Sequence, residues 1–233
     1  MMNQAARRAA HKVTRYGLYP KKINDWVFFE DDFLEFRKNS SDEKGWIETA
    51  VSVGTGTSAF AKADGHGGIL HGVSAANEND GAQIQWVSEF VLLQAHKRMF
   101  FEAKLKISEK TQSDLLVGLC IRDTTAIAGV SDGVFFMKDD GDANIDCVTV
   151  KNTSSTDDDD SGEDIADDTL VRLGTYWDGV KLNYYVDGKM VASLTDQDNI
   201  PLDEELTPTI AFLNGDANVR TWDVDYIRVE MER

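Results

Sequence analysis

Residues 176–194, YWDGVKLNYYVDGKMVASL, decide the fold class of this chain. They contain two Asp-Gly pairs, at 178–179 and 187–188, each placed between runs of alternating apolar and polar residues. Asp-Gly is a strong signal for a two-residue hairpin turn, because glycine adopts positive φ without steric cost. Together with the preceding run TLVRLGTYW (169–177), the stretch predicts a three-stranded antiparallel meander. Its expected interior side chains are Val180, Leu182, Tyr184 and Val186.

Short strand-like runs continue along the chain from Trp26 onward, divided by Gly, Asn and Asp, and no helical period of 3.6 residues interrupts them. In RMFFEAKLKI (98–107), apolar residues alternate with Glu102, Lys104 and Lys106, which predicts a strand with one packed face and one solvent face. LLVGLCI (115–121) is apolar on both faces and predicts a central, buried strand. We therefore predict an all-β sandwich of two antiparallel sheets. The packed face of residues 98–107 is expected to consist of Met99, Phe101, Ala103, Leu105 and Ile107.

Charge is distributed unevenly over the 233 residues. The net charge is −17, yet residues 1–22 contain six Lys and Arg and no acid. We predict a basic N-terminal arm, residues 1–24, followed by one sandwich domain, residues 25–233. An acidic body argues against direct binding of nucleic acid or of an anionic membrane, since phosphate contacts need clustered Lys and Arg. The arm's expected partner-binding residues are Arg7, Arg8, Lys12, Arg15, Lys21 and Lys22.

Targeting signals and disulfides are not expected. The chain contains no apolar run of about 18 residues, and no hydrophobic core of a secretory signal follows the basic start. We therefore expect a protein that is made, and stays, in the cytoplasm of the producing cell. Cys120 and Cys147 both lie in apolar strand-like runs, which predicts buried, reduced thiols.

The order of these segments resembles the concanavalin A-like lectin and glucanase superfamily. DDFLEF (31–36) followed by Trp46 is similar to its opening strand, residues 99–107 and 115–121 to its central pair, and residues 222–232 to its last strand. The resemblance runs from about Asp31 to Glu232 and implies a jelly roll of two large antiparallel sheets. GGILHGVSAANENDGAQIQW (67–86) looks more like virion proteins of tailed bacteriophages than like plant lectins.

That second resemblance implies a structural virion protein, a capsid cement or decoration protein on the capsid surface. Its partners would be the major capsid protein and neighbouring copies of itself, held through the basic arm, and we expect a homo-oligomer, with a trimer preferred. The alternative is a lectin-like module that binds host-surface glycans.

Catalysis is not expected from the strand ANIDCVTV (143–150). Glycosidases of this superfamily place two Glu around a central Asp on alternate residues, so that the acid and the nucleophile lie about 5 Å apart on one face. Asp146 matches the central Asp, but Asn144 replaces the first Glu, and Val148 or Thr149 replaces the second. An amide cannot be the nucleophile and neither replacement supplies an acid. We therefore expect a chain that is not an enzyme.

Two further sites are candidates. A lectin needs an aromatic platform beside polar groups, and Trp177, at the head of a hairpin turn, is the expected exposed ring, whereas most other tryptophans should pack in the sandwich. Residues 157–168, DDDDSGEDIADD, contain eight acids and are expected to form a solvated acidic loop. The alternative is a calcium loop, although an Asp stands where an apolar residue is required. Its ligands would be Asp157, Asp159, Ser161 and Asp168; otherwise we expect no cofactor.

Overall fold

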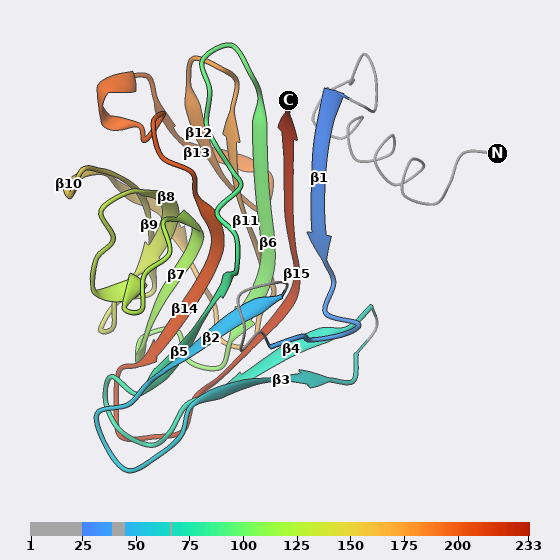
Figure 1. The fold of residues 1–233 in the computed structure, drawn as a ribbon. Helices are drawn as coiled ribbons and strands as arrows, with labels where there is room; N and C mark the ends of the chain where they lie inside the picture. The colour runs from blue at the N-terminus through green and yellow to red at the C-terminus, as the bar shows by residue number, and fades with distance from the viewer. Residues whose placement is uncertain (1–24, 39–44, 66) are drawn as a thin grey trace.

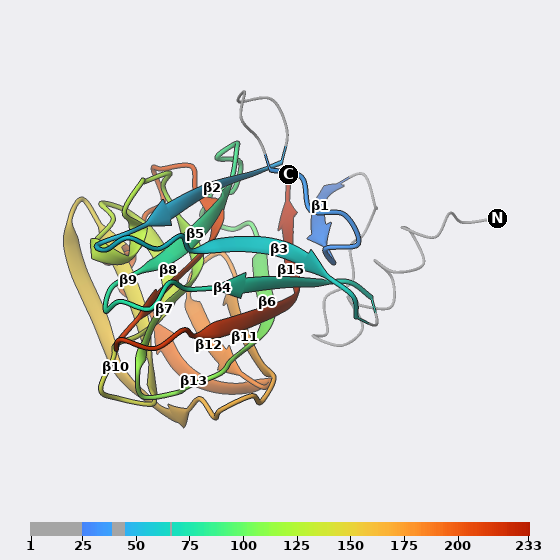
Figure 2. The ribbon, with the colours of Figure 1, turned by 90° about the horizontal axis from the view of Figure 1, so that it is seen from below.

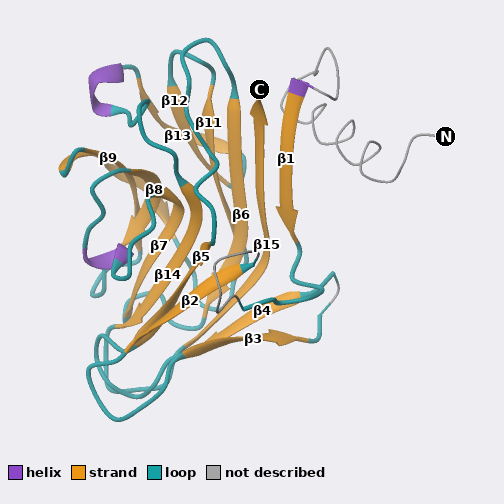
Figure 3. Cartoon of the chain, viewed as in Figure 1, coloured by secondary structure: helices purple, strands orange, loops and turns teal. Residues whose placement is uncertain are grey.

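Two antiparallel β-sheets packed face to face form this protein (Figure 1). The computed structural model describes residues 25–38, 45–65 and 67–233, and only the backbone of residues 154–159. Strands dominate, and the described helices of the body are single 3-10 turns, η2 (Ala126–Ala128) and η3 (Gln197–Asn199) (Figure 3). Among the described residues, no helix is long and apolar enough to cross a membrane. The predicted all-β sandwich is confirmed.

The first sheet has eight strands, with the long β15 near its middle. β4 pairs with the first part of β15 and β1 with its last part, as Figure 2 shows near the C-terminus. In spatial order the strands are β13 (Lys189–Leu194), β12 (Leu182–Val186), β11 (Val171–Trp177), β6 (Met99–Ile107), β15 (Thr221–Glu232), β4 (Ile69–Val73) and β3 (Ala59–Ala63), with β1 (Trp26–Asp31) also beside β15.

The second sheet has seven strands, and many of its neighbours come from distant parts of the sequence. β14, for example, lies between β7 and β5. In spatial order the strands are β10 (Ser154–Asp164), β9 (Asn144–Lys151), β8 (Gly133–Lys138), β7 (Ser113–Cys120), β14 (Thr207–Asn214), β5 (Gly81–Trp86) and β2 (Trp46–Val51).

The predicted meander is present as β11, β12 and β13. Asp187 and Gly188 both have positive φ, 49° and 85°, the geometry of the tight turn that suits a twisted hairpin. The other turn is wider, because the Asp178 carboxylate accepts the backbone N–H groups of Val180 and Lys181. Strand β12 therefore begins only at Leu182. Val180 lies in this turn and is 46% exposed, so its expected interior position was wrong.

A continuous apolar layer fills the space between the sheets, and the predicted packed face of β6 belongs to it, with every member at most 1% exposed. Leu182, Tyr184 and Val186 also point into it. The Tyr184 hydroxyl, from the first sheet, donates to the Val148 carbonyl at 2.7 Å and lies 2.8 Å from the Thr149 hydroxyl. Both partner residues are in β9, so one side chain joins the two sheets. β7 is buried on both faces, as predicted.

Two segments differ from expectation. Residues 31–36 were expected to be the opening strand, but the strand is β1, five residues earlier. The chain turns after it because the Asp31 carboxylate accepts the Phe33 N–H at 2.9 Å while Phe33 takes a left-handed φ of 52°. The acidic segment was expected to be a loop, yet most of it is edge strand β10, whose backbone pairs with β9 across two register shifts.

The bond between the sheets yields a stability prediction. Tyr184→Phe leaves the Val148 carbonyl and the Thr149 hydroxyl buried without this partner, and we expect the free energy of unfolding to fall by about 1–3 kcal/mol. Tyr185→Phe, on the opposite face of the same strand, is the matched control and should change it by less than about 0.5 kcal/mol. Urea denaturation of both variants measures the difference, and equal midpoints would contradict the assignment.

Candidate functional site

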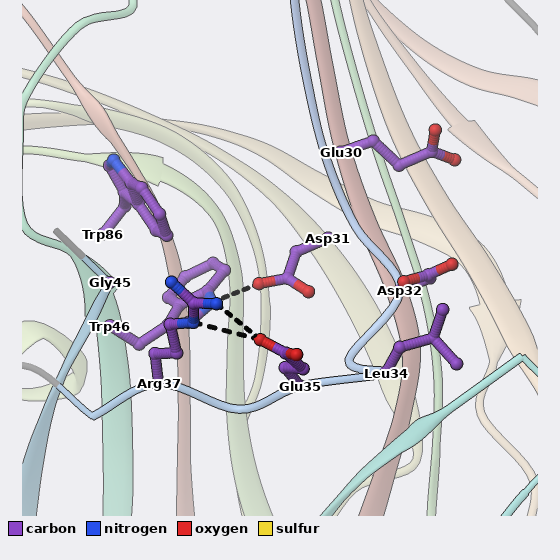
Figure 4. A pocket seen from close by; sticks show the side chains of 9 residues that line it. All are labelled: Glu30, Asp31, Asp32, Leu34, Glu35, Arg37, Gly45, Trp46 and Trp86. Carbon is purple, nitrogen blue, oxygen red and sulfur yellow. Dashed lines mark hydrogen bonds and ion pairs between the residues drawn. The ribbon is translucent and has the colours of Figure 1, made fainter. Parts of the chain in front are cut away.

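A pocket lies beside the end of β1, where the chain turns toward β2 (Figure 4). Its volume is about 400 Å³. β1 and the turn after it supply the charged side chains, and the paired strands β2 and β5 supply two tryptophans. The lining residues are Glu30, Asp31, Asp32, Leu34, Glu35, Arg37, Gly45, Trp46 and Trp86.

The two indole rings form the apolar wall of the pocket. Trp46 and Trp86 are opposite each other on β2 and β5, and their rings meet edge to face at 5.5 Å between centroids. Phe29 packs against Trp86 at 4.9 Å. Trp46 is completely buried, whereas Trp86 is only partly buried. Trp86 is therefore the ring that a ligand in the pocket can touch, and its neighbours hold it in place.

Polar groups surround these rings. Asp31 is already engaged, since its carboxylate accepts the Trp46 indole N–H at 2.8 Å as well as the Phe33 N–H. Glu35 accepts two hydrogen bonds from the Arg37 guanidinium, at 2.6 and 3.1 Å, and both side chains are largely exposed. The hydrogen bond from Arg37 lowers the pKa of Glu35. Figure 4 shows Asp31, Glu35 and Arg37 grouped near the indoles, with the Glu30 carboxylate turned away.

In β9, the strand that was compared with the glycosidase motif, alternate side chains point to the same face, as predicted. In β9, Ile145 and Cys147 point into the layer between the sheets, so Asn144, Asp146 and Val148 point to the opposite face. The Asn144 amide donates to Asp146 at 2.8 Å. Val148 is 6% exposed and belongs to a second apolar cluster on that outer face.

Residues 121–132, between β7 and β8, cover part of this outer face. Two side chains of β5 hold the segment: the Gln85 amide donates to Ile121 O at 3.0 Å and accepts Asp123 N–H at 2.9 Å, and Gln83 accepts Ala126 N–H at 2.9 Å. Figure 3 shows η2 on the side of the sheet that faces away from the other sheet. Beneath the segment lie Leu116, Cys120, Phe135, Val148, Val150 and Ala211.

The predicted binding residues have different outcomes. Trp177 was expected to be exposed, and this is wrong: it is fully buried, because alternation in β11 turns its ring into the layer between the sheets, where its indole N–H donates to Gln94 O at 2.8 Å. The six cationic residues of the arm lie outside the described residues. Cys120 and Cys147 are free and buried, as predicted.

The predicted calcium ligands are not gathered by the described side chains. Ser161 is 9% exposed and its hydroxyl accepts the Glu163 N–H. Asp168 lies beyond the end of β10, with Lys106 3.9 Å away. The side chains of Asp157 and Asp159 are outside the description. Among the side chains that the structure describes, no three His, Cys, Asp or Glu residues could hold a metal ion together.

Comparison with known proteins shows which solved structures share this fold. No family model and no curated protein matches the chain. Among solved structures, endo-1,3-β-glucanase from Streptomyces sioyaensis matches with a TM-score of 0.64 at 10% identity, over 92% of this chain and 99% of that one. The Bacillus licheniformis β-glucanase matches with 0.60 at 13% identity, over 87% and 97%. The potassium-bound Emp46p carbohydrate recognition domain matches with 0.57 at 13% identity, over 79% and 87%.

The fold is the concanavalin A-like jelly roll. The predicted jelly-roll fold is thus confirmed, whereas membership of the superfamily and the further likeness to phage virion proteins stay predictions. The expectation that the chain is not an enzyme is contradicted, since glucanases are among the structures that match. It rested on the missing carboxylates of one strand, β9, whereas this fold is shared by hydrolases and carbohydrate-recognition domains.

The covering segment can be tested through Cys120, which lies beneath it. Burial raises the pKa of the Cys120 thiol, so it should not react with Ellman's reagent at pH 7.5. Replacing both Gln83 and Gln85 by Ala removes the side chains that hold residues 121–132, and we expect Cys120 to react at least about tenfold faster. Adding Cys120→Ser should abolish the new reactivity. An unchanged rate would show that these bonds do not hold the segment.

Proposed function

We propose that this protein binds carbohydrate in the pocket at Trp86. The observation that carries the proposal is the arrangement of the pocket: a partly exposed indole ring lies beside a carboxylate and a guanidinium group. The fold supports it, because the structures that match include a carbohydrate recognition domain and glucanases.

Each group has a chemical role. A sugar ring has apolar C–H faces and hydroxyl groups at its edge. Trp86 supplies a flat apolar surface for such a face. The Glu35 carboxylate accepts hydrogen bonds from hydroxyl groups and Arg37 donates to ring or hydroxyl oxygens. Because Glu35 and Arg37 already orient each other, little side-chain freedom is lost when a ligand binds.

The size of the pocket indicates a short ligand segment. A volume of about 400 Å³ is near the lower end of the range for small-molecule sites, about 300–1,000 Å³. The pocket is also open to solvent through its exposed members, including Leu34, which is 56% exposed. The pocket therefore suits the end of a glycan, or a short glycan, better than it suits a small molecule that must be completely enclosed.

Glycan binding can be tested by substitution. A glycan array first identifies a ligand, and calorimetry then measures its affinity. We expect Trp86→Ala and Glu35→Gln each to weaken binding at least about tenfold, which corresponds to about 1.4 kcal/mol. Glu163→Gln is the matched control, because Glu163 forms a similar surface ion pair, with Lys189, far along the chain from the pocket. Equal affinity in all variants, or no glycan bound on the array, would contradict the proposal.

The capsid role stays a separate prediction. It derives from the basic arm and the phage-like segment, and it includes a place on the virion, a homo-oligomeric state and contacts with the major capsid protein. Deleting residues 1–22 should leave a folded body that no longer binds capsids, because the cationic contacts are lost. Occupancy on purified particles measures this, and undiminished occupancy would reject a role for the arm.

A further inference from the structure

The pocket at Trp86 is acidic, and its charge bears on which sugars it can hold. Of the lining residues that the structure describes, four carry a carboxylate and one carries a guanidinium group. The Glu30 carboxylate is turned away from the indoles (Figure 4) and lies 3.5 Å from Arg228. The other carboxylates of the lining belong to Asp31, Asp32 and Glu35.

Arg37 does not neutralise this lining. Its guanidinium group donates two hydrogen bonds to Glu35, so the two side chains together carry no net charge. The two hydrogen bonds that Asp31 accepts come from a backbone N–H and an indole N–H, and both donors are neutral. The next cation along the chain, Lys38, pairs with Glu48 at 2.6 Å. The pocket therefore keeps an excess of negative charge beside its indoles.

The Trp86 indole favours a cationic ligand as well. A positive charge near the face of an indole is attracted by the quadrupole of the ring. Trp86 is partly buried, and Phe29 and Trp46 pack against it, with centroids 4.9 and 5.5 Å away. Partial burial lowers the local dielectric, which strengthens both this attraction and the attraction to a carboxylate. An ammonium group beside Trp86 would thus be stabilised by an aromatic ring and by carboxylates.

We infer that the pocket selects sugars with a free amino group, such as glucosamine units, over neutral and anionic sugars. The inference rests on the proposed carbohydrate function and names the substrate class of the same site. An amino sugar has the shape of the matching neutral sugar, with an ammonium group in place of one hydroxyl group. Its ring lies on Trp86 in the same way, while the ammonium group donates charge-assisted hydrogen bonds to Asp31 or Glu35.

Charge also disfavours the opposite class of ligand. An anionic sugar would bring a carboxylate or sulfate group to a pocket whose lining is acidic, on a chain with a net charge of −17. Like charges repel at this range and slow the encounter as well. Arg37 is already hydrogen-bonded to Glu35, so an anion would have to compete with that carboxylate for the guanidinium group.

Calorimetry with the full-length chain and three tetrasaccharides of the same linkage tests the selection. They are the β-1,4-linked tetramers of glucosamine, of N-acetylglucosamine and of glucose. At about pH 6, where the ligand amine is protonated as an α-amino group is, we expect the glucosamine tetramer to bind at least about tenfold tighter than either neutral tetramer. The preference should fall in about 1 M NaCl. It should disappear at about pH 9, because the ligand amine is then neutral.

Arg37→Gln should change the affinities for the two classes of sugar in different directions. It removes the cation of the lining and releases the Glu35 carboxylate, so the glucosamine tetramer should bind at least about threefold tighter. A neutral tetramer loses a hydrogen-bond donor and should bind no tighter. Lys189→Gln is the matched control, because it removes a cation from a similar surface ion pair, with Glu163, and it should change neither affinity.

The outcomes separate this inference from the function on which it rests. Equal affinity for the glucosamine and glucose tetramers would overturn the selection of amino sugars and leave the pocket as a carbohydrate site. Binding of another glycan without the glucosamine tetramer would do the same. Tighter binding of the glucosamine tetramer by Arg37→Gln and Lys189→Gln alike would show attraction to the acidic protein as a whole and would also overturn the selection. If no glycan binds at all, both the selection and the carbohydrate function are wrong.

Discussion

One apolar layer between two sheets holds this protein together. Every strand that borders the layer must point alternate side chains into it, and the remaining side chains go to the two outer faces. β6 shows the rule, because its inward residues are at most 1% exposed while Lys104 and Lys106 pair with acids outside. The layer also contains a polar link, the Tyr184 hydroxyl, which is satisfied by β9 and so fixes one sheet against the other. What the outer faces carry is then free to differ between proteins of this fold.

The outer face of the seven-stranded sheet shows how that freedom is used. Residues 121–132 cover part of it and exchange hydrogen bonds with Gln83 and Gln85, so Val148 lies in an apolar cluster rather than on an open surface. The pocket forms elsewhere, where the chain leaves β1. Its rigid wall depends on the apolar layer as well, because Phe29 and Phe33 pack against Trp86 and Trp46.

The fold of this protein does not by itself determine its chemistry. Glucanases and a carbohydrate recognition domain match at 10–13% identity, which shows a shared architecture and leaves the reaction to individual side chains. On β9 an Asn–Asp hydrogen bond stands where the resemblance implied a catalytic pair, and at the pocket an ion pair stands beside an indole. The carbohydrate proposal therefore rests on the side chains that line the pocket.

Local patterns in the sequence were enough to predict the class of fold, the strands β6 and β7, the Asp-Gly turn at residues 187–188 and the buried cysteines, because alternation and turn chemistry depend on near neighbours in the chain. The candidate site was not predictable in this way. Trp46 and Trp86 are far apart in sequence and meet only because β2 pairs with β5. Trp177 lies beside a hairpin turn, a local pattern that is also typical of an exposed ring. Its ring is buried because alternation along β11 turns it into the layer between the sheets. Which side chains face a pocket is decided by long-range strand pairing, and no short stretch of sequence carries that information.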